Sequence, residues 1–439
     1  MGRPDPGTHL HTAAAVRILC NLRISCMAAT AATSLHRWLR WRLVLERQAS
    51  TSGSQQVEGS AALASELAAL PAAALLAEIR RQRLAAVLAP DLPWLSADPA
   101  LAPLAGGLRG LHQQDTRAAL ALQHLTLRVL ALFAQAGLPV LVLKGIPLAL
   151  QTSGTATARG RGDLDLLVPP HQLPAAVALL EAHGFSRPYG KFPLNLDSFW
   201  GRYSRWAGYE LPLHRHGPAG GEWIDLHWHL APVRQPLPSF AELWRRRAQL
   251  QLQGHPLPTL GLADALLFAA VHAAKDDWHS LRHLVDLHRL ASRISADALA
   301  ALRRHRLVRL SAGVAHVATA GPELLALSQP VPLGLQQALA LSLRAQALPA
   351  TPQPLPGPWR FRRWLALLAR QSSLSPAPCD WLRVLFSFTL LPAAFNDPIT
   401  GKDRGLGEML IARWRRLGDR RRPVFSGSSP ASSQSAPAP

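Results

Sequence analysis

The sequence of 439 residues is poor in cysteine and lysine and lacks a long uncharged apolar run. Its three cysteines, Cys20, Cys26 and Cys379, have the spacing of neither a metal site nor a disulfide framework, which favours a reducing compartment. No run of about 18 uncharged apolar residues occurs, so we expect no transmembrane segment. The N-terminus also lacks the apolar core of a secretory signal. These absences together predict a cytoplasmic protein.

The positive charge is carried almost entirely by arginine, because only four lysines occur among 47 basic residues. The formal net charge of +20 suits a partner that carries phosphate, whether nucleic acid or a small molecule. The basic residues are scattered, apart from short clusters such as Arg245–Arg247 and Arg420–Arg422. We therefore favour small phosphate-bearing molecules and do not expect nucleic acid as a partner.

Composition and periodicity divide the chain into six segments. We expect a poorly ordered N-terminal extension with an over-extended start, a helical region, an α/β core, a helical domain, a basic C-terminal helical segment and a disordered Ser/Pro/Ala-rich tail. In chain order these segments span residues 1–60, 61–137, 138–253, 254–346, 347–425 and 426–439.

Apolar spacing predicts the elements within these segments. Apolar residues that recur three and four positions apart predict helices at 111–133, 263–274 and 281–293. An Ala/Leu-rich run predicts another helix at 175–183, which Gly184 ends. Short apolar runs predict strands at 139–143, 164–168 and 223–230. The fold class is therefore α+β, with a mixed sheet between helical domains.

The stretch Gly-Asp-Leu-Asp-Leu-Leu-Val at 162–168 is the strongest chemical signal. Residues two apart in a strand share a face, so Asp163 and Asp165 project together. Two carboxylates at the end of a buried strand repel each other, and a divalent cation such as magnesium relieves that repulsion. A solvated turn with two solubilising aspartates is the alternative, because a bare Asp-x-Asp often occurs by chance.

A strand-to-helix turn precedes this stretch. The apolar run at 140–143 leads into Lys144 and Gly145, and Pro147 suits the first turn of a helix. Glycine permits close backbone approach, and the free N–H groups of a helix N-terminus bind phosphate. Taken alone, the segment favours an ordinary strand-to-helix turn.

The third predicted strand adds a carboxylate. Alternation places Asp225, His227 and His229 on one side of it. Asp225 could complete a two-metal site or act as a general base. The two histidines could face substrate, serve the fold or, less favourably, bind zinc, for which no further ligand stands at a useful spacing.

Three stretches together carry a family resemblance: Leu-Lys-Gly at 143–145, an arginine shortly before Asp-Leu-Asp-Leu-Leu-Val at 163–168, and Ile-Asp-Leu-His-Trp at 224–228. A helical segment follows, with His-Ala-Ala-Lys at 272–275 and Leu-x-x-Leu-x-Asp at 281–286. The combination resembles the bacterial family of uncharacterised nucleotidyltransferases in the DNA polymerase β-like superfamily. It is closest over 138–290 and weaker on both sides, from about 61 to 423.

The resemblance implies a nucleotidyltransferase-type mixed sheet with flanking helical domains, and a nucleoside triphosphate (NTP) such as ATP as co-substrate. Asp163 and Asp165 match the metal-binding pair of the family, and Asp225 matches the third carboxylate, so that two Mg²⁺ ions are expected.

Lys144 and Gly145 match the turn that approaches the triphosphate, and either Arg159 or Arg161 matches the family arginine. The wider superfamily has Gly-Ser or Gly-Gly in this turn, whereas Ile146 follows Gly145 here, so a serine contact to phosphate is missing.

Two roles are possible for the polar residues of the later helical segment. His272 and Lys275 lie three apart on one predicted helix and share a face, where they could contact substrate along with His227. Asp286 lies on the next helix, where Lys275 or Arg282 could pair with it. A polar network that fixes the helices to each other is an equal alternative.

The expected reaction is transfer of a nucleoside monophosphate to an acceptor, either a small molecule or a protein, with release of pyrophosphate. One alternative is a non-catalytic nucleotide-binding module with the same fold. Another is a kinase-like enzyme that transfers the γ-phosphate, although the chain contains neither a P-loop nor the protein-kinase motifs.

Overall fold

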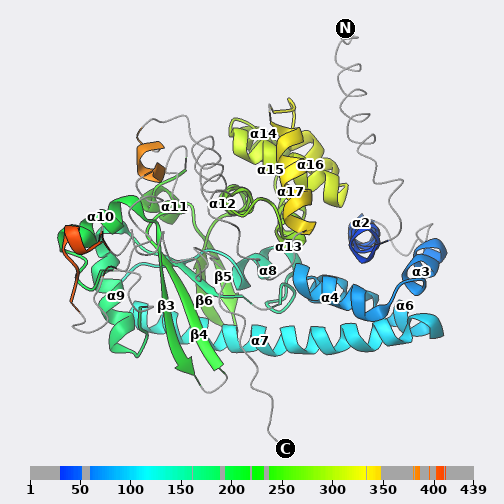
Figure 1. Cartoon of the computed structure of the whole chain (residues 1–439), viewed down its shortest axis with the longest axis horizontal. Helices are drawn as coiled ribbons and strands as arrows, with labels where there is room; N and C mark the ends of the chain where they lie inside the picture. Colours follow the sequence, from blue (N-terminus) through cyan, green and yellow to red (C-terminus); the bar gives the residue numbers. More distant parts are fainter. Residues whose placement is uncertain are drawn as a thin grey trace, which may run out of the picture.

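The computed structural model describes residues 30–51, 60–160, 162–187, 193–217, 220–231, 237–332 and 334–347, with shorter stretches at 379, 381–385, 395, 402–409 and 411. Arg161, the tail at 426–439 and most of the segment at 347–425 therefore lie outside the described residues. The chain forms a mixed sheet with helices on both faces and a helical region beside it (Figure 1).

The N-terminal region is helical, as its composition predicts. Its elements are α2 (Ala31–Thr51), α3 (Ser60–Ala68), α4 (Ala72–Gln82), α5 (Ala85–Leu88), η1 (Ala89–Asp91), α6 (Leu92–Ala97), η2 (Pro99–Leu101) and α7 (Ala102–Gln135).

The expectation of poor order up to residue 60 is wrong for helix α2. Leu35, Trp38 and Leu39 recur at helical spacing and are fully buried. The Trp38 indole also donates to the Asp91 carboxylate at 2.7 Å. Burial of this apolar stripe against the other N-terminal helices explains why the segment is ordered.

Helix α7 connects the helical region to the sheet. Its 34 residues extend over about 50 Å. Leu104 and Leu108 near its start belong to the core of the helical region, whereas Val129 and Phe133 near its end pack beneath the sheet. Gly137, with φ +66°, follows the last turn, where a left-handed residue commonly ends a helix.

The sheet has six strands in the order β3-β4-β2-β1-β6-β5. They are β1 (Leu141–Val142), β2 (Leu164–Leu167), β3 (Glu210–Gly217), β4 (Gly220–His227), β5 (Ala248–Leu252) and β6 (His255–Thr259). β2 pairs with β4 and β1 with β6 in parallel, and the other neighbours are antiparallel. The predicted mixed sheet and α+β class are confirmed, although β3, β5 and β6 were not predicted.

Shorter helices lie between the strands. They are α8 (Ile146–Ser153), η3 (Pro170–Gln172), α9 (Leu173–Ala182), α10 (Phe199–Ala207) and α11 (Phe240–Arg245). The last hairpin of the sheet, β5–β6, contains residue 253, where the sequence predicts the end of the α/β core.

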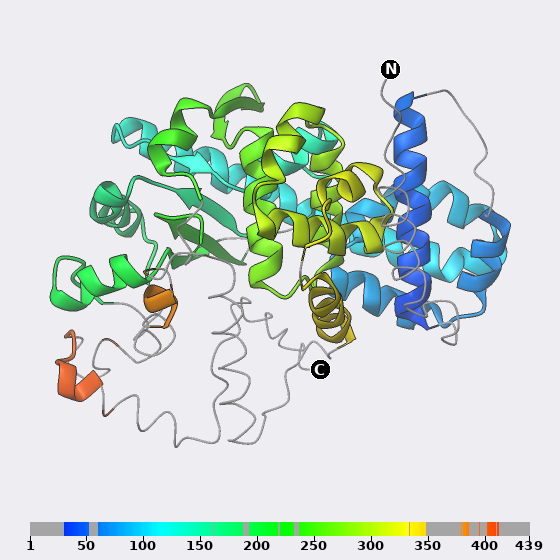
Figure 2. The same ribbon diagram turned by 90° about the horizontal axis from the view of Figure 1, so that it is seen from above.

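A second group of helices covers the other face of the sheet. It comprises α12 (Leu262–Lys275), α13 (Leu281–Ala291), α14 (Ala296–Leu302), α15 (Arg306–Thr319), α16 (Pro322–Leu327) and α17 (Leu335–Ala347). Figure 2 shows this group between the sheet and the N-terminal helices.

The two faces of the sheet belong to different cores. Leu164 and Leu166 of β2 pack with α7 and α9, whereas Leu167 belongs to the core that contains α12 and α13. Since Asp165 lies between Leu164 and Leu166 in this alternating strand, its side chain faces α12 and α13. The predicted acidic site therefore lies on the sheet face that the second group of helices covers.

Among the described residues, the stretch Pro99–Gln135, which contains α7, is long and apolar enough to cross a membrane by length and composition alone. Core helices of soluble proteins meet the same criterion, and the apolar residues of α7 pack in both cores.

Burial of His288 in α13 generates a prediction on acid stability. Its side chain is 9% exposed and hydrogen-bonds Thr319 at 3.2 Å, and burial lowers its pKa from 6.5 to about 4. Between these values the unfolded chain binds the proton and the folded chain does not, so stability is lost as pH falls. Through His288, the unfolding free energy of the wild type should fall by about 2 kcal/mol when the pH is lowered from 7 to 5. We expect His288→Asn to lack this part of the fall.

Urea unfolding of the two proteins at both pH values measures this difference. His255→Asn, at an exposed position on β6, is the matched control and should keep the wild-type pH dependence. An unchanged pH dependence in His288→Asn would contradict the assignment.

Candidate functional site

Three carboxylates lie together where the parallel strands β2 and β4 run side by side. Asp165 of β2 is in register with Asp225 of β4, and Asp163 directly precedes β2. Burial, and next the charge of Asp165, raise the pKa of Asp163, and the same two causes raise the pKa of Asp225 to about 7. The structure therefore brings together all three carboxylates predicted from the sequence, at an electrostatic cost.

Asp165 is the centre of this group. Lys144 Nζ lies 3.1 Å and His227 Nε2 lies 3.2 Å from the same oxygen, Asp165 Oδ1. Burial opposes ionisation of Asp165, but the charge of Lys144 and the hydrogen bond of His227 outweigh it, so the pKa is below its ordinary value. The other oxygen, Oδ2, is buried and has no hydrogen-bond partner in the described part of the chain.

Gly145 sets the turn beside the carboxylates. Its φ of +81° is one that side-chain-bearing residues rarely adopt, and it caps the N-terminus of α8, with a proline in the first turn as predicted. A Cβ atom at Gly145 would lie 3.9 Å from the backbone oxygen of Asp163. The turn thus lies against the acidic segment.

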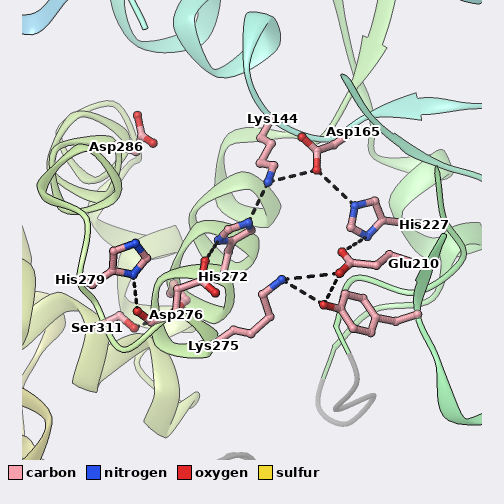
Figure 3. Close-up of polar contacts among 12 residues, drawn as sticks. Lys144, Asp165, Glu210, His227, His272, Lys275, Asp276, His279, Asp286 and Ser311 are labelled. Atoms are coloured by element: carbon pink, nitrogen blue, oxygen red, sulfur yellow. Dashed lines mark hydrogen bonds and ion pairs between the residues drawn. The ribbon is translucent and has the colours of Figure 1, made fainter. Parts of the chain in front are cut away.

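A fourth carboxylate, Glu210, lies on β3 and was not predicted. His227 Nδ1 is 3.7 Å from Glu210 Oε2, so His227 lies between Asp165 and Glu210 (Figure 3). The Tyr209 hydroxyl donates to Glu210 at 2.6 Å, and Lys275 donates to the Tyr209 oxygen at 3.0 Å. His227 therefore connects Asp165 with Glu210. The alternation of side chains along β4 does not reveal this contact.

On the side of α12, Lys144 Nζ is 2.8 Å from His272 Nε2, and His272 Nδ1 is 3.3 Å from the Asp276 carboxylate. Burial, followed by the charges of Lys144 and Lys275, lowers the pKa of His272 well below its ordinary value. His272 is consequently neutral near pH 7 and can accept the hydrogen bond of Lys144.

Arg159 binds Asp286 on α13. Its Nη2 is 2.8 Å from one carboxylate oxygen, and its Nε is 2.9 and 3.1 Å from the two oxygens. Lys275 and Arg282 were the partners suggested for Asp286 from the sequence. Lys275 instead contacts Tyr209 and Glu210. The loop after α8 brings Arg159 to Asp286.

The sequence predicts a metal at Asp163, Asp165 and Asp225, and the buried Oδ2 atom of Asp165, which has no hydrogen-bond partner among the described residues, suits a hard cation. Among the described residues, the ligand atoms that all lie within 4.8 Å of one another belong to a second group, His272, Asp276 and His283. The sequence patterns did not indicate the second group, since its members come from two helices.

A family model described as "Uncharacterised nucleotidyltransferase" matches residues 69–325 of the chain. The matched range contains the carboxylate group, the turn at Gly145 and both helices that cover the site. No curated protein and no solved structure matches the chain.

The buried pair of Arg159 and Asp286 generates a prediction on stability. Removal of one partner leaves an uncompensated buried charge, whereas removal of both does not. We expect Arg159→Met and Asp286→Leu each to lower the unfolding free energy by about 3 kcal/mol, and the double variant to lose much less than the sum. Urea unfolding of the four proteins gives the coupling energy. Additive effects would contradict a direct pair.

Repulsion among the carboxylates generates a second stability prediction. Asp225→Asn removes a buried charge that Asp165 and Glu210 repel. Without divalent metal, we expect the variant to be more stable by on the order of 1 kcal/mol, and therefore to unfold at a higher temperature. Calorimetry in a chelating buffer measures the change, with exposed Asp197→Asn as the control. A lower melting temperature for Asp225→Asn would refute the repulsion.

Proposed function

The chain belongs to the family of uncharacterised nucleotidyltransferases, and we propose that it transfers a nucleoside monophosphate from an NTP, such as ATP, to an acceptor and releases pyrophosphate. The observation that carries the proposal is the group of Asp163, Asp165 and Asp225 on adjoining parallel strands. A group so costly to assemble favours a ligand of opposite charge.

The residues present suit magnesium. Asp165 is held ionised by Lys144 and His227, and its buried Oδ2 atom lacks a protein partner among the described residues. We propose that Asp163, Asp165 and Asp225 hold two Mg²⁺ ions. When bound, these ions would neutralise the triphosphate and the charge that develops during transfer.

The chain's own residues account for the proton and for the phosphate charge. The acceptor O–H oxygen forms a bond to the α-phosphorus, and the bond from that phosphorus to the oxygen bridging to the β-phosphate breaks. Pyrophosphate leaves with the electron pair. We propose that Asp225, while sharing a metal ion, orients the acceptor hydroxyl and takes its proton.

We propose that Lys144 and Arg159 compensate phosphate charge. Lys144 directly precedes Gly145, the residue that caps α8, and its ammonium group contacts Asp165. Arg159 lines the same cavity as Lys144. Arg161, the other arginine matched by the resemblance, lies outside the described residues and stays a candidate for the same role.

Three further polar residues face the site and are proposed as substrate contacts. His227 orients Asp165 through its hydrogen bond, and His272 and Lys275 extend the polar surface from α12. The acceptor, a small molecule or a protein, would be bound on this side. A cytoplasmic location and the absence of a nucleic-acid partner remain predictions from the sequence.

Calorimetry of NTP binding tests the proposal. We expect the wild type to bind at least one of the four common NTPs only when Mg²⁺ is present, and Asp163→Asn/Asp165→Asn to lose about a hundredfold in affinity, because the metal ligands are removed. Exposed Asp197→Asn is the matched control and should bind as the wild type does.

Labelled NTP then tests transfer. With an extract of small molecules as the source of acceptor, the α-label should enter product and the γ-label should be released as pyrophosphate. Transfer of the γ-label would show a kinase-like enzyme, and binding without transfer would favour the non-catalytic alternative. A folded wild type that binds none of the four NTPs would refute the function.

A further inference from the structure

A tryptophan lies on the same face of the sheet as the carboxylate group. Trp223 belongs to β4 and stands two residues before Asp225, so the two side chains share one face, whereas Ile224 and Leu226 point into the opposite core. Trp223 is partly exposed, although a tryptophan side chain gains more from burial than most others. A large apolar ring is therefore available to a ligand beside the acidic site.

The register of the sheet places Trp223 next to Asp163. Ile224 is the partner of Leu164 in the parallel pair of β4 and β2, and Trp223 and Asp163 directly precede these two residues. On the side of β1, a Cβ atom at Gly145 would lie 3.9 Å from the backbone oxygen of Asp163. The turn at Gly145 and the Trp223 side chain thus flank the acidic segment from opposite sides.

His214 of β3 supports the Trp223 ring. The two residues are cross-strand partners, and their rings stack with centroids 5.1 Å apart and planes inclined by 22°. His214 Nδ1 donates to the backbone oxygen of Ser186 at 3.0 Å, which fixes the imidazole ring. Since β3 and β2 lie on opposite sides of β4, the face of the indole that His214 leaves free is directed toward Asp163.

Gly221 keeps the edge of the indole uncovered. It stands two residues before Trp223 on the same face of β4, and a Cβ atom there would lie 3.1 Å from the indole Nε1 atom. A side chain at position 221 would therefore press against the ring. Glycine inside a strand weakens the strand and often marks a close approach by a ligand or by another backbone.

A cross-strand pair that only stabilises the β3–β4 hairpin is the alternative, because stacked pairs on neighbouring strands are a common source of sheet stability. Two features go beyond that role. The ring stands beside a predicted metal ligand, Asp163, and the strand carries Gly221 where a β-branched residue would strengthen the same hairpin.

The chemistry of the proposed reaction assigns the two sides of Asp163. In phosphoryl transfer the attacking and leaving oxygens lie roughly in line through the phosphorus. The turn at Gly145 and the N-terminus of α8 suit the phosphates that leave. The acceptor would therefore approach from the opposite side, where β4 carries Asp225 and Trp223.

Resting on the proposed function, we infer that Trp223, supported by His214, stacks against a planar ring of the acceptor. Residues two apart in a strand are about 7 Å apart, which sets the separation between a hydroxyl at Asp225 and a ring on Trp223. The acceptor class is therefore a hydroxylated small molecule or side chain with an aromatic or heteroaromatic ring within about 7 Å of the reacting hydroxyl.

Two variants of Trp223 separate a substrate contact from a structural role. Trp223→Phe keeps a ring that can stack, whereas Trp223→Leu keeps only an apolar contact to His214. With α-labelled NTP, Mg²⁺ and a whole-cell extract as the source of acceptor, we expect Trp223→Leu to need about tenfold more extract for half-maximal labelling, because one stacked ring is lost. The maximal rate should change little, and Trp223→Phe should behave as the wild type does.

Calorimetry separates the acceptor from the base of the nucleotide. In Trp223→Leu, the affinities for the Mg²⁺ complexes of NTP and of inorganic tripolyphosphate, which has no base, should both equal those of the wild type. Trp206→Leu is the matched control, since Trp206 is an exposed tryptophan on α10, and circular dichroism verifies that the variants fold. Weaker NTP binding with unchanged tripolyphosphate binding in Trp223→Leu would place the base on this ring and overturn the assignment to the acceptor.

The labelled product of the wild type gives a second test that needs no variant. A phosphodiesterase releases the acceptor, and its mass and ultraviolet spectra should reveal a planar ring. An acceptor without such a ring, or an unchanged requirement for extract in Trp223→Leu, would refute the inference and leave the function standing. A wild type that binds no NTP would overturn both the function and the inference.

Discussion

Repulsion among buried carboxylates is the constraint on which the site depends. Asp165 and Asp225 are neighbours in register on parallel strands, and Asp163 is two residues away. Without compensation such a group would take up protons or open the structure. Among the described residues, Lys144 and His227 contact one oxygen of Asp165, and burial, followed by the charge of Asp165, raises the pKa of both Asp163 and Asp225. The fold holds the group together through the two cores on either side of the sheet.

Much of this arrangement could be predicted from local sequence. Asp163 and Asp165 stand at the start of a short apolar run, and Gly145, with Pro147 soon after it, signals a strand-to-helix turn, so their positions in a strand and a turn require no distant information. The helices of the second group follow from three- and four-residue spacing that continues over several turns. These features are encoded by residues close together in the chain.

The features that could not be predicted depend on long-range contacts or on broken patterns. Pro212 lies within β3, and Pro256 and Pro258 lie within β6, and proline inside a run argues against a strand when only the sequence is known. Loss of β3 from the prediction also hid Glu210. The pairing of Arg159 with Asp286 joins residues 127 positions apart, and no local pattern indicates which carboxylate an arginine will contact.

Lys144 couples the two charged halves of the site. Its ammonium group stands between the Asp165 carboxylate and neutral His272, and so acts as the counter-ion of the acidic group. A divalent cation at the carboxylates would take over that task and repel Lys144, which would then need another anion. In the proposed reaction, the triphosphate of the NTP would supply that anion. Under the proposed function, metal and phosphate would therefore favour each other's binding through Lys144.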